Sequence, residues 1–209
     1  MGRLKIEFRV RELRYSCRLS AECFEIYFQT LFDLNAINDI YPDLKDIDQA
    51  IYDPYTYPLI RYRNTSPEMK MASIFCALDD LQLREVKIIE QLDEIQGRIK
   101  FPNSFKLFAK NTLRFSKHMQ GHISVNDIYK ILQGTDAFRN PEYFYLMMEF
   151  YSLADTEETG DDFKLSVEIV IEAFDSCKDI RYNKDLFKGL KGDAIKDKLD
   201  ALRIEKINS

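Results

Sequence analysis

The sequence has no tryptophan and only two histidines, His118 and His122, among its 209 residues. Histidine is the side chain that most often serves as a metal ligand or as a general acid or base near neutral pH. Its scarcity confines histidine-dependent chemistry to one short stretch of the chain. The glycine-rich phosphate-binding motifs GxxxxGK[ST] and GxGxxG are absent, as is the GxSxG motif of hydrolases. We therefore expect no cofactor.

Cysteine is also sparse, and the four cysteines, Cys17, Cys23, Cys76 and Cys177, include no CxxC pair. Zinc ribbons and dithiol redox centres are built on such pairs. Their absence argues against both classes of site. Scattered single cysteines are typical of a reducing compartment, so the expected localisation is cytoplasmic.

Long hydrophobic runs are missing as well. No stretch approaches the roughly 20 apolar residues that a membrane-spanning helix needs. Residues 1–18 alternate charged with apolar side chains and so lack the hydrophobic region of a signal peptide. We expect a soluble intracellular protein with no membrane partner.

Acidic residues outnumber basic ones, 35 to 30, which gives a net charge of -5. Nucleic-acid binding through phosphate neutralisation needs an excess of lysine and arginine, so this balance disfavours it. Six basic residues do gather near the N-terminus: Arg3, Lys5, Arg9, Arg11, Arg14 and Arg18. We favour a solvated strand face for them, and nucleic-acid binding through this basic N-terminal strand is the alternative.

The N-terminal part predicts a strand followed by helices. Residues 4–10 alternate apolar and charged side chains, which is typical of a half-buried strand, and residues 57–63 could pair with it at a sheet edge. Apolar residues at helical spacing then predict a helix from Ser20 to about Leu34 and a shorter one over residues 44–51.

The clearest helical signal follows Ser66-Pro67-Glu68, where an N-cap, a first-turn proline and an early acid coincide. Apolar residues then recur at heptad spacing: Met71, Ile74, Leu78, Leu81, Ile88, Leu92 and Ile95. They predict one long helix over 67–96, or two helices that break near Asp79-Asp80. This heptad stripe could mediate self-association, but we favour packing against helices of the same chain.

Further helices are predicted over the rest of the chain. One covers residues 105–119 and is ended by Gly121, which puts His118 in its last turn, and the next begins at Ser124 and stops at Gly134. A helix opened by Asn140-Pro141 is apolar nearly all round and is expected to be the central buried one. Residues 163–174 fit a strand or a helix begun at Ser166, and we choose the helix. A charged helix starts at Asp193.

These elements predict a mainly α protein, an irregular multi-helix bundle with a small N-terminal β-strand or two-stranded element. We expect one domain over residues 1–209. A subdivision into residues 1–56, the strand and first helices, and residues 66–209, the helical bundle, is conceivable because prolines interrupt the segment between them.

Two groups of residues are candidates for function. His118 and His122 could form a metal site, and with Arg114 they could supply the acid–base groups of a small helical hydrolase or nuclease, although we favour surface or capping roles for the histidines. Tyrosine and arginine are enriched where proteins bind each other. The partner-binding candidates are therefore Tyr52, Tyr55, Tyr57, Arg61, Tyr62 and Arg63, with packing of these tyrosines onto the core as the alternative.

The favoured function is that of a non-enzymatic interaction protein, an adaptor, regulator, inhibitor or immunity factor that binds another macromolecule. We expect this macromolecule to be another protein. This interpretation depends on the missing catalytic motifs and on the several surfaces that could make contacts. The hydrolase or nuclease and the nucleic-acid-binding protein are the alternatives.

Overall fold

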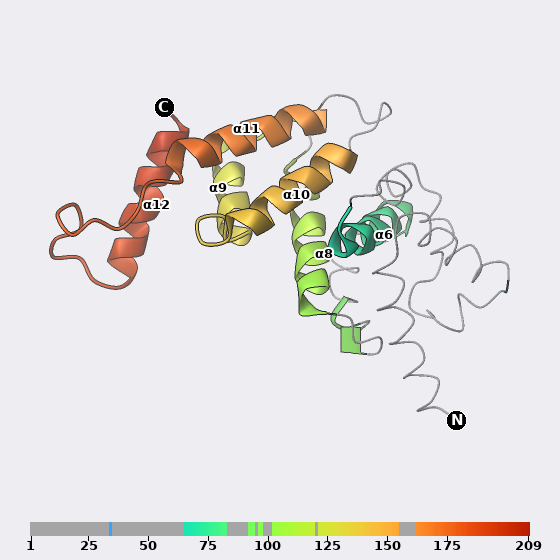
Figure 1. Ribbon diagram of the computed structural model, residues 1–209. Coiled ribbons are helices and arrows are strands. Elements are labelled where there is room, and N and C mark those ends of the chain that lie inside the picture. The colour runs from blue at the N-terminus through green and yellow to red at the C-terminus, as the bar shows by residue number, and fades with distance from the viewer. Residues whose placement is uncertain are drawn as a thin grey trace. The chain divides into compact units, whose positions relative to one another are not determined.

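The computed structural model describes residues 65–82, 92–94, 96–97, 102–119, 121–154 and 162–209, together with Leu34. For residues 77–82 and 162–163 it describes the backbone alone. The chain divides into two compact units, and Figure 1 labels the described helices. Unit 1 comprises Met1–Lys117 and Leu153–Glu158, and unit 2 comprises His118–Ser152 and Thr159–Ser209. Each unit is described by itself.

Unit 1 contains helices α6 (Pro67–Gln82) and α8 (Asn103–Ser116), which pack against each other. The start of α6 is the predicted one, because the Ser66 hydroxyl accepts a hydrogen bond of 3.2 Å from the Met69 amide. Residues 92–94 and 96–97 lie beside α8, where Asp93 forms ion pairs of 3.1 Å with Lys106 and 2.7 Å with Lys110.

The described positions of the heptad stripe are covered by this chain itself. Met71, Ile74 and Leu92 are at most 2% exposed. The side chains of the other four positions, and residues 83–91, lie outside the described part, so the continuity of the long helix stays a prediction. The burial of the three described positions favours internal packing, because a side chain already covered offers little surface to a second copy.

The end of α8 differs from the prediction. The helix stops at Ser116, three residues before the expected Met119, so His118 lies in the turn that follows and not in the last helical turn. Gly121 does have the left-handed conformation that was expected of it, with φ of 75°. Residues 117–119, which follow the helix, are not helical, and residue spacing alone could not show this.

Unit 2 contains helices α9 (Val125–Gly134), α10 (Pro141–Ala154, whose last two residues belong to unit 1), α11 (Asp162–Cys177) and α12 (Asp193–Ile207). The predicted cap of α9 is confirmed. The Ser124 hydroxyl accepts a hydrogen bond of 3.2 Å from the Asp127 amide and donates one of 2.6 Å to the Asp127 carboxylate. At the other end, the helix stops at Gly134, as predicted, and Asp136 two residues later has a left-handed conformation with φ of 54°.

Aromatic side chains from α10 and α11 form the core of unit 2. The ring of Phe144 lies 4.8 Å from that of Phe174, and Phe138 lies 5.8 Å from Phe174. The expectation that α10 is buried all round is too simple, since Glu142, Tyr145 and Glu149 form an exposed stripe along it. This helix therefore has one face in the core and one in solvent.

Residues 163–174 form a helix, as chosen, although α11 begins at Asp162 and not at Ser166. Val167, Val170, Phe174 and Cys177 are buried along one face, and this spacing of three and four excludes the strand. The helix from Asp193 also begins where it was predicted.

Every regular element in the described ranges is a helix, which agrees with a mainly α fold. No helix in these ranges is long and apolar enough to cross a membrane. The N-terminal strand, its partner strand at 57–63, and the helices over 20–34 and 44–51 fall outside the described residues, apart from Leu34. The predicted subdivision between residues 56 and 66 falls there as well, so it stays a prediction.

Candidate functional site

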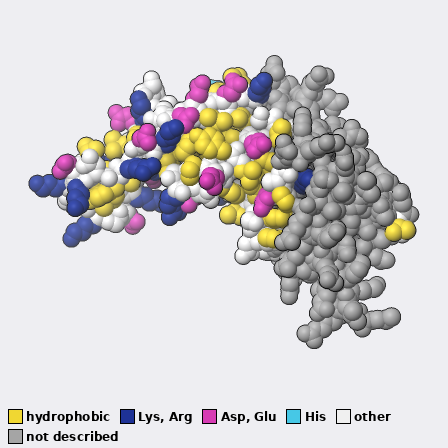
Figure 2. Space-filling model, in the orientation of Figure 1, with side chains coloured by type: hydrophobic (Ala, Val, Ile, Leu, Met, Phe, Trp, Pro, Cys, Tyr) yellow, Lys and Arg dark blue, Asp and Glu magenta, His cyan; other side chains and the backbone are white. Residues whose placement is uncertain are grey.

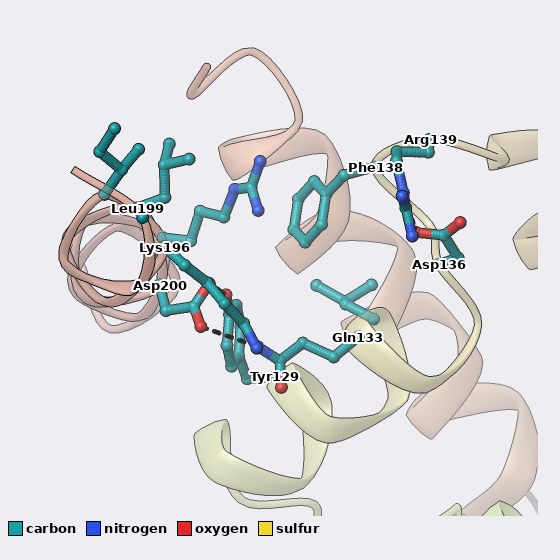
Figure 3. Close-up of a pocket in the computed structure, with 12 residues that line it drawn as sticks. Tyr129, Gln133, Asp136, Phe138, Arg139, Lys196, Leu199 and Asp200 are labelled. Carbon is teal, nitrogen blue, oxygen red and sulfur yellow. Dashed lines mark hydrogen bonds and ion pairs between the residues drawn. The ribbon is translucent and has the colours of Figure 1, made fainter. Parts of the chain in front are cut away.

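A cleft of about 680 Å³ opens in unit 2 between α9, the turn at residues 136–139 and α12 (Figure 3). Its apolar lining includes Leu132 from α9 and Ile195 and Leu199 from α12, and charged side chains stand around them. The helix on one side of the cleft is unusual, because none of the described residues of α12 is buried. Polar contacts, rather than a buried apolar stripe, therefore hold α12 against α9.

The carboxylate of Asp200 is the centre of these polar contacts. The Tyr129 hydroxyl donates a hydrogen bond of 2.5 Å to one Asp200 oxygen, and the Gln133 amide donates one of 3.0 Å to the other. Figure 3 shows both α9 side chains directed at this residue of α12. Hydrogen bonds to a charged acceptor are stronger than neutral ones, so this carboxylate links the two helices firmly.

Arg203, one turn farther along α12, makes the second link. Its guanidinium carbon lies 3.6 Å from the centre of the Phe138 ring, and Nη2 donates a hydrogen bond of 3.1 Å to the carbonyl oxygen of Ile180. The flat guanidinium thus joins α12 to the turn after α9 and to the chain that follows α11. Its Nε is buried and has no hydrogen-bond partner among the described residues.

Burial raises the pKa of the Tyr129 hydroxyl to about 12, and the hydrogen bond to Asp200 and that residue's negative charge act in the same direction. Arg203 opposes this shift. The three effects that raise the pKa arise from the surroundings of Tyr129 in the cleft, since an apolar environment and a nearby carboxylate both disfavour the phenolate. Burial likewise raises the pKa of the Cys177 thiol, again opposed by Arg203, which makes this thiol a poor nucleophile.

Tyr129 should remain protonated at a pH at which an unperturbed tyrosine has ionised. A raised pKa in the folded state means that its contribution to stability is complete below about pH 10 and is lost as the pH rises toward 12. In a ¹³Cζ NMR titration of tyrosine-labelled protein, the resonance that Tyr129→Phe removes should titrate near pH 12. A midpoint near 10 for that resonance would contradict the proposed contact with Asp200.

The candidates for acid–base or metal chemistry are divided between the two units. Arg114 is exposed on α8 in unit 1, where its guanidinium lies 5.4 Å from the centre of the Phe115 ring. His118 and His122 belong to unit 2, and His118 Nδ1 lies 3.2 Å from a carboxylate oxygen of Asp127. His122 is exposed just before α9.

Asp127 is already engaged by the start of its own helix. Besides capping with Ser124, it forms an ion pair of 3.2 Å with Lys130 through the oxygen that faces His118. The Ser124 hydrogen bond is the main reason why the pKa of Asp127 is lowered, with Lys130 and His118 adding to it. A lysine ammonium at this oxygen competes with any metal ion, and the described residues contain no cluster of three or more possible metal ligands.

The partner-binding candidates Tyr52, Tyr55, Tyr57, Arg61, Tyr62 and Arg63 lie outside the described residues. The structure instead shows a surface that the sequence analysis missed. The connection between α11 and α12 has four exposed basic residues within eleven positions, against one acidic residue, Asp185. We call residues 181–191 the basic connection, and its basic members are Arg181, Lys184, Lys188 and Lys191.

The basic connection combines charge with exposed apolar side chains. None of its four basic residues forms an ion pair with a carboxylate in the described part of the chain. Tyr182 is 53% exposed and Leu186 is 56% exposed, whereas Phe187 is buried. Figure 2 shows lysine and arginine gathered at the end of unit 2 that this connection and α12 form. The spacing of basic residues by three and four positions was a readable signal, overlooked because the whole chain is acidic.

The cleft could not have been recognised in the same way. Its central contact joins residues 71 positions apart in the sequence. Neither residue belongs to a local motif, so only the fold brings them together.

No family model, no curated protein and no solved structure matches this chain.

Proposed function

We propose that this is a non-enzymatic interaction protein, an adaptor, regulator, inhibitor or immunity factor, in which unit 2 binds an acidic segment of another protein. The observation that supports this most strongly is the basic connection. Its four basic residues form no ion pair within the described part of the chain and are close in sequence to two large apolar side chains, Tyr182 and Leu186, that are more than half exposed. Solvent-exposed apolar side chains inside a field of one charge are typical of a binding surface.

An acidic protein fits this surface better than a nucleic acid does. Three of the four basic residues are lysines, which act as point charges rather than as the planar forks that read bases or clamp phosphates. A phosphate backbone would leave Leu186 without an apolar partner. A protein segment can offer carboxylates and apolar side chains together.

The polar groups of the cleft support binding rather than a reaction. Asp200 is held by Tyr129 and Gln133, and Asp136 is held by Arg139 at 2.7 Å. Both carboxylates thus have structural partners, whereas a general base must reach the substrate's proton. The alternative nuclease would depend on Arg114, His118 and His122, but Asp127 beside His118 is engaged in capping α9.

The test is quantitative affinity capture, in which the purified full chain is used as bait to recover its partner from lysate of the native source. The double variant Lys184→Glu/Lys188→Glu should retain at least about tenfold less of an acidic partner, because it turns attraction into repulsion. Lys164→Glu/Lys206→Glu is the matched control, with the same change of charge at exposed positions on α11 and α12, and should retain as much as the wild type.

Two results would contradict the proposal. One is equal retention of the partner by both double variants. The other is recovery of RNA or DNA as the ligand, with loss of binding after nuclease treatment, which would assign the basic connection to nucleic acid instead.

A further inference from the structure

We infer that the cleft between α9 and α12 receives a large apolar side chain of the partner's acidic segment, while the neighbouring carboxylates of that segment contact Lys196 and the basic connection. This inference rests on the proposed function and adds the kind of segment that binds: a short acidic peptide with one apolar anchor.

The cleft and the basic connection form one continuous surface. Gly192, which lines the cleft, directly follows the last residue of the connection and caps the start of α12. A segment bound at the C-terminal end of residues 181–191 therefore lies next to the cleft at Gly192. Lys198 fastens the two together, since its ammonium donates to the carbonyl oxygen of Leu186 and lies 5.4 Å from the centre of the Phe187 ring.

The floor of the cleft suits an apolar group. Leu132 is buried, and Ile195 and Leu199 are half-buried one turn apart on α12, next to the half-buried Phe138. Burial of further apolar area here would lower the free energy by about 25 cal/mol for each Å². Since no described residue of α12 is buried, Ile195 and Leu199 keep apolar surface at the floor that a partner can cover.

The charges around the floor select an acidic segment. Two carboxylates at the cleft already have partners within the chain. Asp136 lies 2.7 Å from Arg139, and Asp200 accepts a hydrogen bond of 2.5 Å from Tyr129. Lys196 is exposed at the rim, and the described residues provide no carboxylate within ion-pair distance of it. A basic segment would place like charges against Lys196 and the connection, and a neutral one would leave them unpaired.

The probes are two acetylated and amidated nonapeptides, one of nine glutamates and one with phenylalanine in place of the central glutamate. Their dissociation constants for the full chain are measured by fluorescence anisotropy at low salt, and the binding site is mapped from amide shifts in ¹H–¹⁵N spectra. The phenylalanine peptide should bind at least about fivefold more tightly, because part of its phenylalanine side chain is buried in the cleft. Its largest shifts should fall on α9, the turn at 136–139 and α12.

Two variants test the place of the anchor. Leu199→Gln should abolish the advantage of the phenylalanine peptide, whereas Leu202→Gln should preserve it, since Leu202 is equally half-buried on α12 but does not line the cleft. Lys184→Glu/Lys188→Glu should weaken both peptides alike.

The outcomes separate this inference from the proposed function. Equal affinity of the two peptides, or an advantage that survives Leu199→Gln, would overturn the anchor in the cleft and leave an acidic partner on the basic connection standing. Absence of binding by both peptides at millimolar concentration would overturn the inference too. Weakening by Leu199→Gln without any effect of Lys184→Glu/Lys188→Glu would instead contradict the proposed function.

Discussion

Replacement of Phe174 by alanine is expected to lower the free energy of unfolding by about 3–5 kcal/mol, the range for a large aromatic side chain removed from a core. Phe174 is 3% exposed, and its ring lies 4.8 Å from that of Phe144 and 5.9 Å from that of Tyr145. Through Phe138 at 5.8 Å it also supports the turn that forms one side of the cleft. The missing ring would leave a cavity that movement of α10 and α11 toward each other cannot fill completely.

The measurement is urea unfolding of the full chain followed by circular dichroism, because the described part of the protein is helical. Leu165→Ala is the matched control on the same helix, since Leu165 is 57% exposed and its loss should change stability by no more than about 0.5 kcal/mol. A loss below about 1 kcal/mol for Phe174→Ala would show that the aromatic cluster is not the core of unit 2.

Replacement of Arg203 by lysine is expected to lower the free energy of local unfolding of α12 by about 2 kcal/mol, although the charge is kept. A lysine cannot stack a flat group 3.6 Å from the Phe138 ring while donating to the Ile180 carbonyl. The stacking is expected to contribute about 1–2 kcal/mol and the charged hydrogen bond about 1.5–3 kcal/mol, which lysine replaces in part. The loss should be concentrated in α12, which has no buried residue to hold it.

Hydrogen exchange of the amides of α12 is the appropriate readout, because it reports local opening as well as global unfolding. Arg203→Lys should speed exchange in α12 far more than in α10. Arg181→Lys is the control, an identical change at an exposed arginine of the basic connection, and should leave both helices as they are. Uniform acceleration over the whole of unit 2 by Arg203→Lys would contradict the view that α12 is held mainly by polar contacts.

Local signals in the sequence were sufficient to predict most of the described helices. Ser124 with Asp127, and the start of α12 at Asp193, are determined by neighbouring residues and lie where they were predicted. The spacing of Val170 and Phe174 likewise identified a helix rather than a strand, because a helix buries residues three and four positions apart on one face.

The failures have physical causes as well. The end of α8 was misplaced because turn residues after Ser116 can share helical spacing without helical hydrogen bonds. The candidate site was not predicted, because Asp200 and Tyr129 are distant in sequence and meet only through packing of α12 on α9. The basic connection, in contrast, is visible in the sequence as basic residues spaced by three and four positions between two helices.

The most direct test of the account is a charge-swap experiment on the complex with the captured partner. Lys184→Glu/Lys188→Glu should weaken the complex at least about tenfold, and a partner in which two acidic residues of the bound segment are replaced by lysine should restore most of that affinity. The dissociation constants of the four combinations of wild-type and variant proteins give the coupling directly. Restoration would establish that the basic connection of unit 2 contacts an acidic segment of a protein. If the changes in the two proteins instead weaken the complex independently, so that their losses of binding free energy add and the affinity is not restored, this contact is contradicted.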